Sequence, residues 1–263
     1  MVLRGALLSL LLILGPSMAV GATAPPTPEI RKTMAPTGKL RVALYTGTTT
    51  SVRSKTNRRG VGYDMGQELA KRLGVPFEPV ILLNNVEVQA AMRAKTADIA
   101  FAHDTPARDV DMDFTQTHLA IELGYLAGPK VKAASMADVD KPGVRVGVTV
   151  GSSSQPILEK AFKNAKVVTT PTLDTGVGLL REGKLDYFAT NKANLGAMQE
   201  KLPGSRVLPG SWGVERHAMA LPKGRQAAMP YAKAFVADIV ANGQVKAAVS
   251  RAGLQGMIND KTP

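Results

Sequence analysis

The sequence predicts an α/β protein made of two lobes, each with a mainly parallel sheet flanked by helices. From Gly38 onward, apolar strand-like segments alternate with helix-like segments, which is typical of parallel sheets covered by helices. The pattern of the first half then recurs in the second half with the same internal spacing. About 225 residues follow the N-terminal segments, enough for one large domain or two small ones.

The first half contains two predicted strands and two predicted helices. Residues 39–45 place apolar side chains on one face, as a half-buried strand does. Asp64 is predicted to cap a helix that carries apolar residues at helical spacing and ends at Gly74. A second helix is expected over residues 87–95, followed by a short apolar strand over residues 98–102.

Two pairs of segments carry the repeat. Residues 41–50 and 145–154 share an Arg-Val start, a glycine at the same distance and a run of hydroxyl residues. Residues 93–98 and 181–186 both run from Arg to Asp and precede strand-like sequence. Because open parallel sheets bind ligands beyond the carboxyl ends of their strands, two such edges facing each other would form a cleft.

The two hydroxyl-rich turns, Thr48–Thr50 and Ser152–Ser154, fit either of two roles. Hydroxyl side chains satisfy turn and helix N-cap positions, and they also bind ligands. We favour ligand contact for the second turn only, because it leads directly into a helix predicted around residues 155–162. The first amides of that helix would attract an anion.

The N-terminus predicts export. Residues 1–22 have the layout of a secretory signal peptide, with Arg4 before an apolar run and small residues up to Ala22. The apolar run is shorter than the ~20 residues that span a bilayer, so an uncleaved anchor is the disfavoured alternative. Residues 23–37 are rich in proline and predict a flexible leader. We therefore expect the mature protein in the periplasm.

Composition excludes several classes of function. The chain has no Cys, which removes disulfides, Cys-zinc sites and thiol nucleophiles. Its formal net charge is +12, but Lys and Arg are scattered and aromatic residues make up only 5%, unlike the clustered footprint of nucleic-acid-binding proteins. His103, His118 and His217 lack metal-binding spacing. We expect no cofactor, no metal and no nucleic-acid partner.

Two motifs resemble those of a known family. Thr105-Pro106-Ala107-Arg108 precedes Met-Asp-Phe-Thr at residues 112–115, and Gly-Tyr-Asp at residues 62–64 enters a predicted helix. In this order and spacing, the chain resembles the bacterial extracellular solute-binding proteins of the polar amino-acid class (family 3), the receptors of ABC importers. The resemblance runs from Gly38 to about Gly256.

The resemblance implies a two-lobed, type II periplasmic-binding-protein fold. Two crossover segments, near Leu119–Gly124 and Ala218–Lys223, would join the lobes. Lobe one would comprise residues 38–121 and 222–263, and lobe two residues 122–221. The protein would act as a monomeric receptor that delivers a small solute to the membrane permease subunits of an importer.

The resemblance also implies ligand-binding residues. Arg108 would hold a ligand carboxylate, because a planar guanidinium binds a carboxylate bidentately. The alternative is a surface arginine paired with Asp109 or Asp111. Further contacts would come from Thr105, His103, Ser152, Ser153, Asn191 and Tyr45.

Two departures from the family pattern bear on the ligand. Amino-acid receptors usually have an aspartate at the position of Asn191, where it pairs with the ligand ammonium, and an amide carries no charge. The loop of residues 46–59 also lacks an aromatic ring to receive a side chain. Both changes favour a more acidic ligand or one with an uncharged tail over a plain zwitterionic amino acid.

An enzyme on the same scaffold is an alternative function. A cyclohexadienyl or prephenate-type dehydratase needs a carboxylate general acid in the cleft, and Asn191 cannot transfer a proton in that role. A hydrolase assembled from Ser152, His103 and Asp104 would lack a nucleophile elbow. We therefore predict no catalytic residues. A ligand-sensing module for a signalling receptor is a further alternative.

Overall fold

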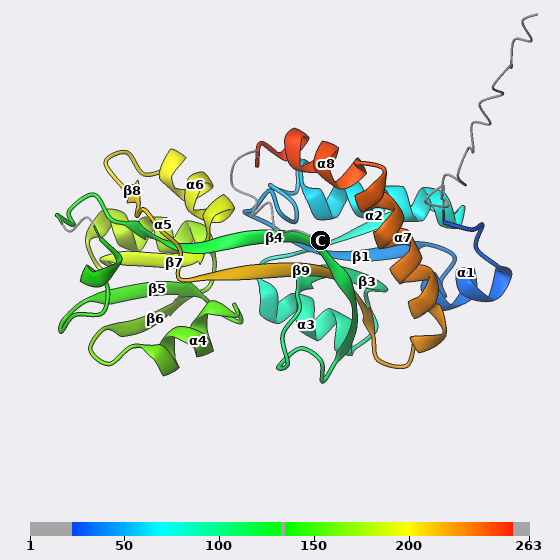
Figure 1. The fold of residues 1–263 in the computed structure, drawn as a ribbon, viewed down its shortest axis with the longest axis horizontal. Coiled ribbons are helices and arrows are strands. Elements are labelled where there is room, and N and C mark those ends of the chain that lie inside the picture. Colours follow the sequence, from blue (N-terminus) through cyan, green and yellow to red (C-terminus); the bar gives the residue numbers. More distant parts are fainter. Residues whose placement is uncertain (1–22, 133–134, 255–263) are drawn as a thin grey trace, which may run out of the picture.

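Two long antiparallel strands, β4 (Met112–Ala127) and β9 (Gly213–Pro222), run through both lobes of the protein (Figure 1). The computed structural model describes residues 23–132 and 135–254, so the predicted signal peptide lies outside the described residues. The strands form a sheet of order β2-β1-β3-β9-β4-β7-β5-β6, in which lobe one lies on the β9 side and lobe two on the β4 side. No helix in the described ranges combines the length and apolar character needed to cross a bilayer.

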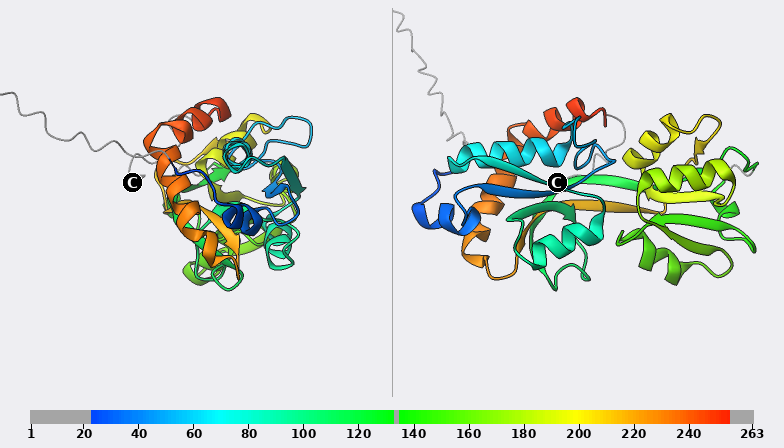
Figure 2. Two further views of the ribbon diagram at one scale, coloured as in Figure 1. Left: turned by 90° about the vertical axis from the view of Figure 1, so that its right-hand side faces the viewer. Right: turned by 180° about the vertical axis from the view of Figure 1, so that it is seen from behind.

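Lobe one has three parallel strands, β1 (Leu40–Tyr45), β2 (Phe77–Leu82) and β3 (Ile99–His103), with β9 antiparallel to β3. Side chains alternate between the two faces of β1, so that Leu44 packs in one core cluster and Ala43 in another. The covering helices are α2 (Val61–Leu73), α3 (Asn85–Arg93), α7 (Met229–Ala241) and α8 (Gln244–Ala252). Helices α2 and α8 lie on one side of the sheet and α3 on the other (Figures 1 and 2).

Lobe two repeats this plan. Its parallel strands are β5 (Arg145–Thr149), β6 (Lys166–Thr170) and β7 (Tyr187–Asn191), and β4 is antiparallel to β7. A short strand, β8 (Arg206–Val207), pairs with the far end of β4. The helices are α4 (Ser154–Ala161), α5 (Leu173–Glu182) and α6 (Lys192–Glu200), and a 3-10 turn, η1 (Met136–Asp138), precedes β5. A second 3-10 turn, η2 (Gln226–Ala228), precedes α7 in lobe one.

The sequence repeat corresponds to one ion pair formed at the same place in each lobe. Asp98 accepts from the backbone N–H of Arg41 (2.9 Å), from its Nε (3.0 Å) and from its Nη2 (2.7 Å). Asp186 accepts from the same three groups of Arg145, at 2.8, 3.0 and 2.9 Å. Each pair ties the first strand of its lobe to the segment that enters the third strand. The repeated Arg and Asp positions are therefore structural in both lobes.

The segment predicted as a flexible leader is in part ordered and buried. Residues Pro28–Met34 form helix α1, and Thr27 caps it by accepting from the Ile30 N–H at 3.2 Å. Met34 is completely buried in the core of lobe one. The prediction was wrong here because Pro28 stands in the first helical turn, where no amide donor is required.

Two predicted boundaries were also wrong. Helix α2 begins at Val61 rather than at Asp64, and Asp64 pairs with Arg251 at 2.8 Å instead of capping the helix. The second crossing comprises residues 213–217, which pair with residues 119–123 of β4, and not Ala218–Lys223. Met219, which follows this crossing, already packs in the core of lobe one.

We predict that the two repeated ion pairs differ in their contribution to stability. Asp98 is completely buried and also accepts from Arg225 at 2.9 Å, whereas the side chain of Asp186 is 27% exposed. Breaking a buried charge pair costs about 3–5 kcal/mol, so Asp98→Asn should lower the free energy of unfolding by about that amount. Asp186→Asn, the matched control, should cost about 1 kcal/mol. Urea unfolding of both variants tests this, and equal losses would contradict it.

A buried histidine lies at the first crossing. The His118 ring packs edge-on against Phe101, with centroids 5.6 Å apart, and its Nδ1 has no hydrogen-bond partner among the described residues. Burial, with His217 nearby, lowers the pKa of His118 from 6.5 to about 3. The folded protein therefore holds this ring uncharged at neutral pH.

We predict that acid destabilises the fold through His118. Between pH 6.5 and about 3 the unfolded chain binds a proton that the folded ring excludes, so the free energy of unfolding falls as the pH falls. From pH 7 to pH 5 this loss should be about 2 kcal/mol for one such group. Urea unfolding at both pH values should show a smaller loss in His118→Phe. An identical pH dependence in the variant would exclude this role.

Candidate functional site

The polar groups predicted at the carboxyl ends of the strands meet between the two lobes. Tyr45 ends β1, His103 ends β3, Asn191 ends β7, and the Ser152–Ser154 turn follows β5. Parallel strands bring these ends to one edge of each sheet, and the crossing strands place the two edges opposite each other (Figure 1). The site is therefore a product of the repeated topology.

Two cavities lie at this junction and share the serine turn as a wall. The smaller, about 20 Å³, is lined by Tyr45, Ser153, Asn191 and Glu215 among others. The larger, about 490 Å³, is lined by Thr105, Arg108, Ser152, Pro156 and Ile157 among others. The smaller cavity has room for little more than a water molecule.

Direct contacts between the lobes explain why the inner cavity is small. Thr48 Oγ1 in lobe one donates to Asn194 Oδ1 in lobe two. His103 Nδ1 and Ser153 Oγ are hydrogen-bonded at 2.8 Å. The lobes are thus closed on each other, and a solute that enters must displace some of these contacts.

Arg108 lies in the loop between β3 and β4 and is only 5% exposed. Its Nη1 donates to the carbonyl of His103 at 2.9 Å, and its Nη2 donates to the carbonyl of Gly151, in the other lobe, at 3.3 Å. No carboxylate oxygen of the described residues lies within 4.0 Å of its nitrogens. The alternative partner Asp111 pairs with Arg93 instead, at 2.7 Å. Burial lowers the pKa of Arg108, with Glu215 opposing that effect.

Glu215 is a site residue that the sequence analysis missed. It lies on β9 at the crossing, and its side chain is 15% exposed. Oε2 accepts from Asn191 Nδ2 at 2.7 Å, while Oε1 lies 3.5 Å from His217 Nε2 and 3.9 Å from His103 Nδ1. Burial alone would raise the pKa of Glu215, but the two histidines and Asn191 outweigh it and hold the pKa well below its ordinary value. The sequence feature that could have indicated Glu215 is its spacing of two residues from His217, which places both side chains on one face of a strand.

The structure gives each of the remaining predicted site residues a definite place. Asn191 caps α6 by accepting from the Asn194 N–H at 3.0 Å, so its oxygen and its amide nitrogen both have protein partners. Ser152 lines both cavities, and its Oγ is buried without a hydrogen-bond partner among the described residues. Thr105 borders only the larger cavity, and burial raises the pKa of Tyr45 in the smaller one.

Glu215 also removes one argument against catalysis. The sequence-based argument was that an amide stands where a dehydratase would need a carboxylate, yet Glu215 lies 2.7 Å from that amide. Its lowered pKa keeps it ionised near neutral pH, which is a poor state for a general acid. The case against proton donation therefore rests on the environment of Glu215 and not on the identity of residue 191.

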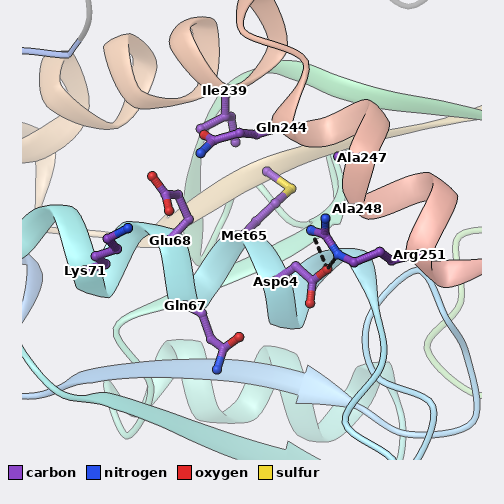
Figure 3. A pocket seen from close by; sticks show the side chains of 10 residues that line it. All are labelled: Asp64, Met65, Gln67, Glu68, Lys71, Ile239, Gln244, Ala247, Ala248 and Arg251. Carbon is purple, nitrogen blue, oxygen red and sulfur yellow. Dashed lines mark hydrogen bonds and ion pairs between the residues drawn. The ribbon is translucent and has the colours of Figure 1, made fainter.

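A separate hollow of about 420 Å³ lies between α2 and α8 on lobe one (Figure 3). Asp64 and Arg251 face each other across it and form an ion pair. The described residues that line it all belong to lobe one, and the charges of Asp64 and Arg251 neutralise each other. The interlobe cavities are the stronger candidates, because Arg108 has no carboxylate oxygen of the described residues within 4.0 Å.

Comparison with known proteins agrees with this architecture. The sequence matches the model of the bacterial extracellular solute-binding proteins, family 3, over residues 41–253. A search of curated proteins gave no match.

Several solved structures share the fold. The solute receptor for L-cysteine of Neisseria gonorrhoeae is 21% identical, with a TM-score of 0.75 over 86% of this chain and 95% of that one. An amino acid ABC transporter substrate-binding protein from Streptococcus pneumoniae, bound to L-arginine, is 19% identical, with a TM-score of 0.71 over 85% and 97%. An ancestral amino acid-binding protein, a precursor of cyclohexadienyl dehydratase, is 20% identical, with a TM-score of 0.71 over 84% and 97%. The predicted type II fold is confirmed.

We predict that Gly151 permits the lobes to close. It has φ +71°, and a Cβ there would lie 2.7 Å from Val86 Cγ2 and 3.1 Å from the Val86 backbone nitrogen, in the other lobe. Gly151→Ala should therefore hold the lobes apart. Gly143→Ala, at φ +82° with no atom within 4 Å of the added Cβ, is the control for backbone strain alone.

Because the chain has no Cys, one engineered cysteine in each lobe can carry a spin label. The distance between the labels should increase in Gly151→Ala and stay unchanged in Gly143→Ala. The same distance in both variants would contradict a role for Gly151 in closure.

Proposed function

Because the chain belongs to the bacterial extracellular solute-binding proteins, family 3, we propose that it binds a small carboxylate-bearing solute between its lobes and delivers it to the permease subunits of an ABC importer. The solute is an amino acid or a related organic acid. The observation that carries this proposal is Arg108, a buried guanidinium that borders the interlobe cavity and lacks a carboxylate partner among the described residues. In this proposal the receptor works as a monomer in the periplasm, after cleavage of the predicted signal peptide.

The chemistry of Arg108 supports a carboxylate ligand. A buried charge is costly unless an opposite charge or several hydrogen bonds compensate it. Two carbonyl oxygens partly satisfy the guanidinium, one from each lobe, which leaves further N–H donors of its planar fork. A carboxylate supplies both the missing charge and the matching geometry.

The serine turn supports the same ligand class. Ser152 Oγ is buried and unpaired, and it borders the cavity that Arg108 also lines. A hydroxyl group in this position can donate to a carboxylate oxygen, which would end the cost of leaving it unsatisfied. Arg108 from lobe one and Ser152 from lobe two can therefore contact one carboxylate from opposite sides.

The enzyme alternative is supported by one observation, the buried carboxylate of Glu215. The proposal favours a receptor because proton donation needs a pKa near the working pH, and the surroundings of Glu215 lower its pKa instead. Turnover of a bound compound, followed by mass spectrometry, would contradict the receptor proposal. A signalling role differs from import only in the membrane partner.

We predict that Arg108→Met weakens binding of carboxylate solutes at least tenfold, because a hydrogen bond to a charged group contributes about 1.5–3 kcal/mol. Mass spectrometry of solute released from the purified protein identifies the first compound for calorimetry, beside panels of amino acids and organic acids. The matched control is Arg216→Met, which removes the same charge from an exposed position on β9. Equal affinities of Arg108→Met and the control would contradict the carboxylate clamp.

A further inference from the structure

The loop between β1 and α2 carries four positive charges within seven residues, at Arg53, Lys55, Arg58 and Arg59 (Figure 1). All four side chains are exposed. The loop from residue 46 to residue 60 contains no Asp or Glu that could balance them. We call residues 53–59 the basic tip.

The surroundings of the basic tip neutralise only part of its charge. Arg53 lies 3.7 Å from Glu200, at the end of α6 in lobe two, and both side chains are largely exposed. Such an exposed ion pair is weak. Among the described residues, no carboxylate lies within 4.0 Å of Lys55, Arg58 or Arg59. These three cations are therefore available to an anionic partner.

Hydrogen bonds fix the backbone of the basic tip. The Arg53 N–H donates to the Arg59 carbonyl at 2.8 Å, which closes the tip, and the Ser54 N–H donates to the Asn57 carbonyl at 3.0 Å. At the base of the tip, Val52 is completely buried in the core of lobe one. A partner does not have to order this backbone, which lowers the entropic cost of binding.

The composition of the basic tip favours a lipid surface over a protein or a nucleic acid. Residues 53–59 include no aliphatic and no aromatic residue. Specific protein interfaces have an apolar core, and single-stranded nucleic acids stack their bases on aromatic rings. Adsorption to anionic headgroups requires only cations close to the surface, and each of these strengthens it about fivefold.

The exposed apolar side chains lie elsewhere on the protein. Among the described residues, the large ones are Leu83, Val86, Val110 and Ile157, none of which belongs to this loop or to α2. Val86 is in α3, on the opposite side of the lobe-one sheet from α2, the helix that follows the basic tip (Figure 2). A protein partner that needs an apolar contact would find it away from the basic tip.

We propose that the basic tip binds the anionic headgroups of a phospholipid membrane and so concentrates the protein at the membrane surface. The attraction is electrostatic, with Lys55, Arg58 and Arg59 as its principal contacts. This interaction goes beyond the proposed function and does not depend on which solute the cleft binds.

Sedimentation with vesicles tests the proposal. The experiment uses the protein without residues 1–22, because the apolar run of the predicted signal peptide would itself enter a bilayer. Wild-type protein should sediment with vesicles of equal parts phosphatidylglycerol and phosphatidylcholine, and should stay in solution with phosphatidylcholine alone. The triple variant Lys55→Gln, Arg58→Gln, Arg59→Gln should bind the anionic vesicles at least tenfold more weakly.

The matched control removes the same charge from another exposed part of the protein. Lys160→Gln, Lys163→Gln, Lys166→Gln changes three exposed cations of lobe two and should leave vesicle binding close to that of the wild type. Raising the salt concentration from about 0.1 M to about 1 M should release the wild-type protein, because the screening length falls from about 10 Å to about 3 Å.

Three results would overturn the proposal. Equal losses in the two triple variants would show that net charge, and not the basic tip, causes adsorption. Wild-type binding to phosphatidylcholine alone that persists at high salt would exclude an electrostatic contact. Wild-type protein that ignores the anionic vesicles but binds poly-L-glutamate through the same three cations would identify an acidic polypeptide as the partner instead.

Discussion

The antiparallel pairing of β4 with β9 is the constraint on which the rest of the structure depends. β9 provides the edge on which β3, and through it the sheet of lobe one, is built, and β4 provides the edge for β7 and lobe two. The carboxyl ends of both sets of parallel strands consequently face the crossing. Side chains at the crossing therefore border the space between the lobes, as Glu215 does in the smaller cavity. The strand that carries Glu215 belongs wholly to neither lobe.

This topology explains which parts of the fold could be predicted from the sequence. The alternation of strands and helices and the repeated Arg and Asp positions are local or evenly spaced, and they gave the two-lobed plan and the fold class. The structure adds the reason for the repeat, because Arg41 with Asp98 and Arg145 with Asp186 form the same ion pair at the same place in each lobe. Helix α1 was missed because prolines that begin a helix and prolines that stiffen a leader are indistinguishable by composition.

The site was predictable to the extent that it is made of strand ends. His103, Arg108, Ser152 and Ser153 follow strands that the sequence indicates, and the structure brings them together between the lobes. Glu215 was missed because its importance comes from strand pairing: it lies opposite Ile121 and beside Asn191, relations that one sequence does not display. The inference drawn from Asn191 was incomplete for this reason, since it considered the amide without the carboxylate of Glu215 that lies beside it.

The distribution of charge between the lobes has a consequence for how a ligand is captured. Arg108 belongs to lobe one and Glu215 to the crossing, whereas lobe two contributes neutral hydroxyl and amide groups such as Ser152, Ser153 and Asn194. Charge-assisted contacts are the stronger ones, so in the proposed function a carboxylate solute would gain much of its interaction energy from Arg108. Closure then adds neutral hydrogen bonds, each of about 0.5–1.5 kcal/mol. In the closed structure, however, two of these neutral groups already contact lobe one, through Thr48 with Asn194 and His103 with Ser153. A ligand therefore competes with interlobe contacts for these neutral groups, and also for Arg108, whose Nη2 donates to the Gly151 carbonyl of lobe two at 3.3 Å.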